Sequence, residues 1–143
     1  MPADAARGRD FGYFAHDADT GIIGRGASVE EAFEGAARAM YEIMADTAAV
    51  RPERRIAVAF DEDDVEIALV RWLNGLLGEA RAEGLILGDF RMRRDGSHWE
   101  GEGLGEPWRD DLVRRVEVKG ATLTALSVRE TDGVWEARCV VDV

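Results

Sequence analysis

Apolar residues recur at intervals of three and four in two stretches of the chain, the spacing of a helix that buries one face. The first stretch opens at Ser28, which forms with Glu31 the S-x-x-E pattern of a capping box. The second opens where Asp63 and Glu66 repeat this pattern, and Gly84 is suited to end it. The apolar stripes are Val29, Ala32, Phe33, Ala36, Met40, Ile43 and Met44, and then Leu69, Val70, Leu73, Leu76, Leu77 and Ala80.

Elsewhere apolar and polar residues alternate with the period of two that is typical of strands. Asp95-Gly96 and Asp132-Gly133 lie between alternating segments and predict two hairpins. In the last strand, Ala137, Cys139 and Val141 share the face that meets the helices, so Asp142 points away from them. The predicted strands are 11–16, 22–25, 56–60, 86–93, 99–104, 116–123, 126–130 and 134–143.

The order of these elements predicts an α+β fold: a two-layer sandwich with two helices packed on one face of a mostly antiparallel sheet. We expect one domain over residues 11–143 and a frayed N-terminus over residues 1–10. Folding a chain of 143 residues buries roughly two-thirds of the surface that the unfolded chain exposes. A domain of this size therefore needs no disulfide or structural metal to be stable.

Charge and cysteine content narrow the functional classes. The net charge of −11 argues against direct nucleic-acid binding, which depends on basic side chains. A single cysteine, Cys139, excludes an internal disulfide framework and suits a reducing compartment. No apolar run is long enough to span a bilayer, and residues 1–10 lack the apolar stretch of a signal peptide. We therefore expect a cytoplasmic protein without membrane association.

Three other patterns have structural interpretations. The acidic run from Asp61 to Asp64 precedes a helix, where carboxylates cap exposed amides. Gly101-x-Gly-x-Gly105 lacks the strand-to-helix context of a phosphate site and is interpreted as a loop. Cys139 lies on an inward strand face and is interpreted as a buried thiol.

The segment His16-Asp17-Ala18-Asp19-Thr20-Gly21 concentrates polar chemistry between two apolar segments, where we expect a loop at the edge of a sheet. Asp17 and Asp19 are candidates for a metal or acid-base role, and equally for turn and capping roles. His16 is a candidate base or ligand, or a group that positions a neighbour. No Ser-His-Asp set and no Cys/His metal spacing accompanies them, so a self-sufficient enzyme is poorly supported.

An ordered set of short motifs resembles the archease family from about residue 11 to residue 143. That family has His-Thr-Ala-Asp-x-Gly near its N-terminus, and Asp17 here replaces the threonine. Further departures are Leu123-Thr124, where tyrosine-histidine often stands, and Arg114 and Arg115 near the place of a common histidine. The matching segments are His16 to Gly21, Ser28 to Phe33, Ala37 with Met40, Val70 to Leu77, Gly105-Glu106-Pro107, Glu117-Val118-Lys119 and Asp142-Val143.

The resemblance implies a non-catalytic partner of an RtcB-type RNA ligase, which joins tRNA halves and repairs broken RNA with GTP and a divalent metal. Archeases promote guanylylation of the ligase and its repeated turnover. The family metal site, carried over, consists of Asp19, Asp142 and the backbone carbonyl of Val143. Such oxygen ligands suit calcium, and also magnesium or manganese. His16, Asp17 and Lys119 are then expected to orient these ligands or contact the partner.

Two alternatives remain open at this point. A small metal-dependent phosphoesterase would use Asp17, Asp19 and His16 and would turn over substrate without a ligase. An acidic protein-interaction module would bind a basic partner without metal.

Overall fold

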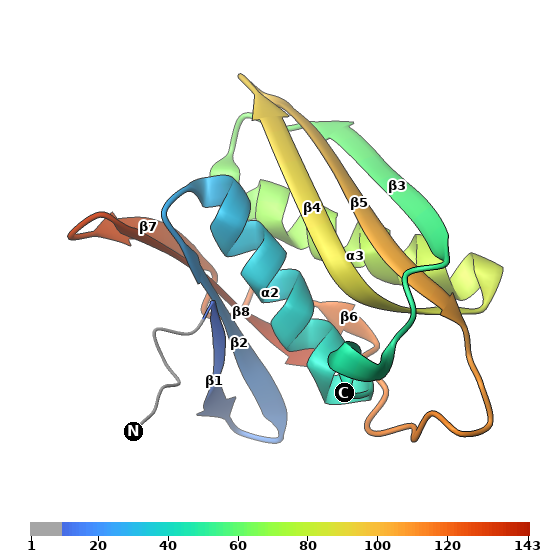
Figure 1. Cartoon of the computed structure of the whole chain (residues 1–143). Helices are drawn as coiled ribbons and strands as arrows, with labels where there is room; N and C mark the ends of the chain where they lie inside the picture. Colours follow the sequence, from blue (N-terminus) through green and yellow to red (C-terminus); the bar gives the residue numbers. More distant parts are fainter. Residues whose placement is uncertain (1–9) are drawn as a thin grey trace.

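The chain folds around two helices that lie between two antiparallel sheets, in a computed structural model that describes residues 10–143 (Figure 1). The first sheet has the order β1-β2-β8-β6, with β7 also paired to β8, and the second has the order β3-β5-β4. The strands are β1 (Phe11–His16), β2 (Asp19–Gly26), β3 (Arg54–Asp61), β4 (Leu85–Asp95), β5 (His98–Pro107), β6 (Gly120–Ala121), β7 (Ser127–Thr131) and β8 (Val134–Asp142). The helices are α2 (Val29–Met44) and α3 (Val65–Glu83), with a 3-10 turn, η1 (Thr47–Ala49), after α2.

The predicted α+β class, with two helices and antiparallel strands, is confirmed. The structure adds that the strands are divided between two sheets. Helix α2 packs on β2 and β8 of the first sheet and on β4 of the second. Helix α3 packs on all three strands of the second sheet and on β6. The predicted frayed segment 1–10 lies outside the described residues except for Asp10, whose carbonyl accepts a hydrogen bond from the Arg25 N–H at 2.7 Å.

Helix α2 begins as its sequence predicts. The Ser28 hydroxyl accepts from the Glu31 N–H at 3.1 Å, and the Glu31 carboxylate accepts from the Ala27 N–H at 3.0 Å. Helix α3 is capped by Asp64 rather than by Asp63, so that prediction is wrong by one residue. The side chain of Asp64 reaches two amides at once, those of Glu66 and Ile67, which makes it the better cap.

Buried contacts join the two helices to each other and to the second sheet. The Trp72 indole N–H donates to the Phe33 carbonyl at 2.9 Å, and the Tyr41 hydroxyl donates to the Leu76 carbonyl at 3.3 Å. The ring of Trp99 on β5 stacks on Phe33 with centroids 4.9 Å apart. Trp72 and Trp99 are fully buried. One core therefore runs from the first sheet through both helices to the second.

Two predicted segments differ from the structure because long-range contacts decide them. Segment 116–123, predicted as one strand, pairs only at Gly120 and Ala121. The Gly101-x-Gly-x-Gly105 segment, predicted as a loop, lies inside β5. A Cβ at Gly101 would lie 2.3 Å from the Trp72 ring, and one at Gly105 would lie 1.9 Å from the Ile86 carbonyl. These glycines allow α3 and β4 to pack closely against β5.

No helix among residues 10–143 is long and apolar enough to cross a membrane.

The contact between α2 and the first sheet depends on Gly24. A Cβ there would lie 2.0 Å from the Ala32 carbonyl oxygen and 2.2 Å from the Ala36 nitrogen, both backbone atoms of α2. We expect Gly24→Ala to lower the free energy of unfolding by about 2–4 kcal/mol, because the helix must move away from the sheet. Urea unfolding monitored by circular dichroism measures this.

Gly12→Ala on the neighbouring strand is the matched control. A Cβ at Gly12 lies 3.3 Å from the end of the flexible Arg25 side chain, which can move. Equal stability losses for the two variants would contradict the close-approach explanation.

Candidate functional site

Three of the predicted site residues, His16, Asp19 and Asp142, lie in one row across the end of the first sheet, which we call the acidic row. His16 is opposite Asp19 in the β1–β2 pairing, and Thr20 is opposite Val141 in the β2–β8 pairing. One further step along the same register places Asp19 opposite Asp142. Asp142 is in turn opposite Gly120 of β6.

The polar side chains of this row share the outer face of the sheet. Val141 is fully buried and faces the helices, so the adjacent Asp142 points outward, as predicted. Directly opposite residues of an antiparallel pair project from the same face, with Cβ atoms about 5 Å apart. His16, Asp19 and Asp142 therefore project side by side toward solvent.

The predicted loop from His16 to Gly21 is wrong in extent, because only Asp17 and Ala18 form the turn. Asp19, Thr20 and Gly21 belong to β2 and pair with β1. Asp17 occupies the left-handed region at φ 49°, which aspartate tolerates better than most residues. Its carboxylate lies 3.8 Å from the His16 imidazole, and its side chain is 93% exposed. Asp17 thus shapes the turn that starts β2 at Asp19.

Asp19 and Asp142 carry like charges at positions that the extended register sets opposite each other. Among residues 10–143 neither carboxylate has a lysine, arginine or histidine within ion-pair distance. Two carboxylates directly opposite each other repel unless a cation lies between them. The chemistry of this pair fits a hard divalent cation, which prefers oxygen ligands.

The same residues supply too few ligands to coordinate such a cation by themselves. Within the described chain, no three side chains of His, Cys, Asp or Glu converge as a metal site. Val143, the remaining predicted ligand, is half-buried beside Asp142, and only its backbone carbonyl is a candidate ligand. Calcium takes about six to eight oxygens, more than two carboxylates and one carbonyl supply. Waters or a partner would have to provide the rest.

Lys119 reaches the row through its backbone. Its N–H donates to the Asp142 carbonyl at 2.7 Å, while its side chain is exposed. This bond aligns β6 with β8 at the site. The Lys119 backbone is thus bonded directly to Asp142, and its predicted role toward the site or a partner stays a prediction.

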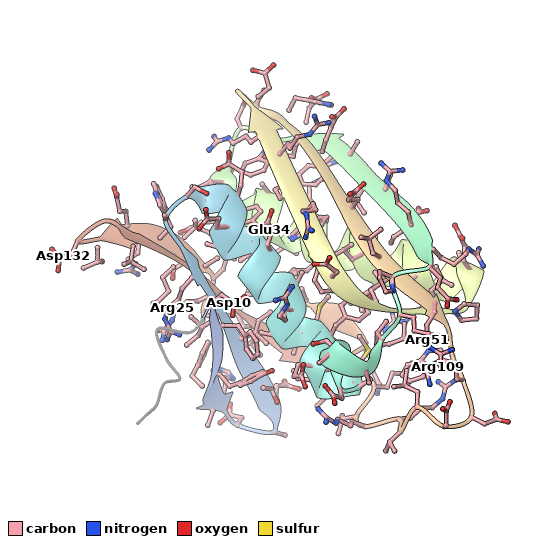
Figure 2. The ribbon with its side chains drawn as sticks, viewed as in Figure 1. Asp10, Arg25, Glu34, Arg51, Arg109 and Asp132 are labelled. Carbon is pink, nitrogen blue, oxygen red and sulfur yellow. The ribbon has the colours of Figure 1, made fainter. Side chains whose placement is uncertain are left out.

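A buried ion pair that the sequence analysis did not assign holds the segment leading to Lys119. Glu106 is 1% exposed; it accepts from Arg109 Nε at 2.9 Å and from the Arg51 N–H at 2.8 Å. Arg109 also donates to the Ala49 carbonyl at 2.8 Å. Figure 2 shows Arg51 and Arg109 near each other below β5. The hydrogen bond from Arg109 lowers the pKa of Glu106 most, and the hydrogen bond from the Arg51 N–H lowers it further. The sequence feature that could have pointed to this ion pair is the Gly105-Glu106-Pro107 motif.

Two further features, the Cys139 thiol and a cavity, do not belong to the acidic row. Cys139 is buried in β8, as predicted, and burial raises the pKa of its thiol to about 12. A cavity of about 540 Å³ lies under segment 108–117, where the Arg114 guanidinium stacks over Trp108. His16, Asp17, Asp19 and Asp142 do not line it. The acidic row lies instead on a sheet face.

Glu106→Gln should destabilise the protein at neutral pH by about 1–3 kcal/mol, because a buried charge-assisted pair is lost. The lowered pKa means that the contribution of Glu106 is present above its unfolded-state pKa and is lost as pH falls through the folded-state pKa. The two proteins should therefore converge in stability in acid. Thermal unfolding across pH tests this, with exposed Asp110→Asn as control; a difference that persists unchanged in acid would contradict it.

A second prediction follows from the repulsion between the carboxylates of Asp19 and Asp142. In buffer containing a chelator, Asp142→Asn should raise the free energy of unfolding by about 0.2–1 kcal/mol, because it relieves like-charge repulsion. Asp17→Asn, which keeps the left-handed turn and alters an exposed carboxylate, should leave stability unchanged. Destabilisation by Asp142→Asn without metal would show that the pair is not repulsive.

Comparison with known proteins gives consistent matches along the chain. The model of the Archease protein family matches residues 11–143. Proteins named archease from Aeropyrum pernix and Sulfolobus acidocaldarius are 33% and 36% identical, covering 90% and 93% of this chain and 93% and 98% of their own lengths.

Two solved structures share the fold. The solution structure of Methanobacterium thermoautotrophicum protein 1598 has a TM-score of 0.84 at 32% identity, covering 94% of this chain and 99% of that one. A Thermotoga maritima crystal structure, described as an archease and possible chaperone, has a TM-score of 0.64 at 19% identity. It covers 91% of this chain and 94% of that one.

Proposed function

The chain belongs to the archease protein family, and on that premise we propose that it activates an RtcB-type RNA ligase in the cytoplasm. It promotes guanylylation of the ligase and repeated turnover during tRNA splicing or RNA repair, and has no catalytic activity of its own. The observation that carries the proposal is the β2–β8 register, in which Thr20 lies opposite Val141. The next residues of the two strands are Asp19 and Asp142, the positions where the family resemblance places a metal site.

The shortage of ligands suits a shared cation. Asp19, Asp142 and the Val143 carbonyl would hold a divalent ion, calcium first and magnesium or manganese otherwise, and leave positions open on the solvent side. Because the row lies on an exposed sheet face, a partner can approach those positions directly. His16, Asp17 and Lys119 flank the ion and are available to contact that partner.

The charge of the chain supports a ligase partner. A ligase that holds GTP phosphates and RNA ends needs a positively charged active site, and a protein of net charge −11 is attracted to such a surface. In this proposal the ligase contacts the RNA, and this chain contacts the ligase. This proposal predicts association that weakens as salt increases.

The phosphoesterase alternative has less support from the geometry. His16, Asp17 and Asp19 project from a strand end and a turn, and Asp17 is 93% exposed. Hydrolytic sites work best where water is excluded and the field is strong.

The deciding experiment measures guanylylation of the RtcB-type ligase from the same genome, with GTP and manganese. The wild-type protein should accelerate adduct formation and support multiple turnovers at substoichiometric amounts. Asp19→Ala and Asp142→Ala should each reduce the rate to that of the ligase alone, because each removes one of two carboxylate ligands. Asp63→Ala, which makes the same charge change at an exposed position on another part of the molecule, should activate normally.

Thermal shifts on the isolated protein separate the metal from the ligase. Calcium or manganese should raise the melting temperature of the wild type and of Asp63→Ala, because a ligand that binds only the folded state stabilises it. The two site variants should bind the cation at least about tenfold more weakly. Activation without any cation response would favour the metal-free module, and nuclease or phosphatase turnover by the purified protein would favour the enzyme.

A further inference from the structure

The strand β3 forms an open edge of the second sheet. Glu62 N–H donates to the Ser97 carbonyl at 2.8 Å, so even-numbered backbone groups of β3 point toward β5 and odd-numbered groups point away. Consistently, the Asp61 carbonyl faces outward and accepts from Arg71 at 2.8 Å. Among residues 10–143, the outward N–H and carbonyl groups of Ala57 and Ala59 have no backbone partner.

The opposite edge of the same sheet is covered. There the Glu34 carboxylate of α2 accepts from the Met92 N–H of β4 at 2.9 Å, and Arg38 pairs with Asp89. Figure 2 shows Glu34 beside β4. An exposed edge of eight residues is a template for a further strand unless something covers it. Among residues 10–143, the outward backbone groups of Ala57 and Ala59 are thus left available to pair with a further strand.

We propose that the open edge of β3 and the adjoining face of α3 form a two-fold interface with a second copy of this chain. In this dimer β3 pairs antiparallel with β3 of the other copy, and the two second sheets become one continuous sheet. The proposal does not depend on the ligase or on the acidic row, which lies on the other sheet.

The charges of β3 are complementary in this register and argue against the register centred one residue earlier. Only odd residues can bond across the edge, and the two-fold pairing that sets Ala57 opposite Ala59 of the other copy also sets Arg55 opposite Asp61. Within one chain, Arg55 pairs with Glu102 and Asp61 pairs with His98. The contact between Arg55 and Asp61 of the other copy would join these two existing ion pairs. Centring the pairing one residue earlier, on Ala57, would instead set Glu53 against Asp61, two like charges.

The helix beside the edge is self-complementary about the same axis. The proposed axis passes Val58, and Gly75 of α3 lies directly over Val58, since a Cβ there would be 2.7 Å from the valine side chain. An antiparallel pair of α3 helices centred on Gly75 sets Arg71 opposite Glu79 of the other copy. Glu79 has no ion pair within residues 10–143, and nothing lies within 4 Å of a Cβ at Gly78. A groove of about 330 Å³ lined by β3, Arg71, Gly75 and Glu79 follows this edge.

The first test uses sedimentation velocity over a wide dilution series of the full chain. The wild type should show a monomer–dimer equilibrium. Ala57→Pro should weaken it by at least about tenfold, because proline removes an outward N–H that β5 does not use. Ala57→Ser, which keeps that N–H, should dimerise as the wild type does, and unchanged circular dichroism of both variants shows that the monomer is folded.

The second test is a charge exchange on α3. Glu79→Arg and Arg71→Glu should each weaken self-association, since each places like charges across the axis. A mixture of the two variants should restore a heterodimer, because every pair across the axis is then opposite in sign. Restoration also rules out misfolding of Arg71→Glu, which loses its bonds to Asp61 and Glu62.

Three results would overturn the proposal. They are a wild type that stays monomeric at every concentration, a dimer that Ala57→Pro leaves intact, and a charge-exchange mixture that does not associate. Binding of a strand from a different protein without self-association would likewise overturn it.

Discussion

The close approach of α2 to the first sheet is the constraint on which the rest of the structure depends. Gly24 and Gly26 of β2 leave no side chain between strand and helix, so the backbone of α2 lies against the sheet. The remaining faces of α2 then meet β4 and α3, and ten of its residues are buried. A helix that is buried on most of its faces must lie inside the molecule. The two sheets are held around it.

That constraint also fixes the acidic row. With the inner face of β2 set by contact with α2, the outer face is set as well, because a shift of one residue would exchange the two faces. Ile22 then faces the core, and Asp19 lies on the outer face, where one further step of the register sets it opposite Asp142. The Lys119 backbone bond and the buried Glu106–Arg109 pair position the neighbouring segment. The placement of two carboxylates therefore follows from packing on the far side of the sheet.

Features set by local chemistry could be predicted from the sequence, and features set by distant contacts could not. The capping box at Ser28, the stop at Gly84 with φ 69° and the Asp132–Gly133 turn depend on neighbours in the sequence. The start of β2 at Asp19 depends on pairing with β1 and β8, and the strand character of Gly101 to Gly105 depends on Trp72 and Ile86. The pairing of Asp19 with Asp142 came from family resemblance, because periodicity does not reveal register.

The connectivity of the two sheets has a consequence for biosynthesis. The second sheet is built from β3, β4 and β5, whose contacts close over a short stretch of chain, whereas the first sheet joins β2 to β8 across the whole sequence. Local contacts form early and non-local pairing forms late. On the ribosome the second sheet and α3 can assemble while β8 is still in the exit tunnel. Asp142 can reach Asp19 only after β8 has left the tunnel, so these two carboxylates come together after the second sheet has formed.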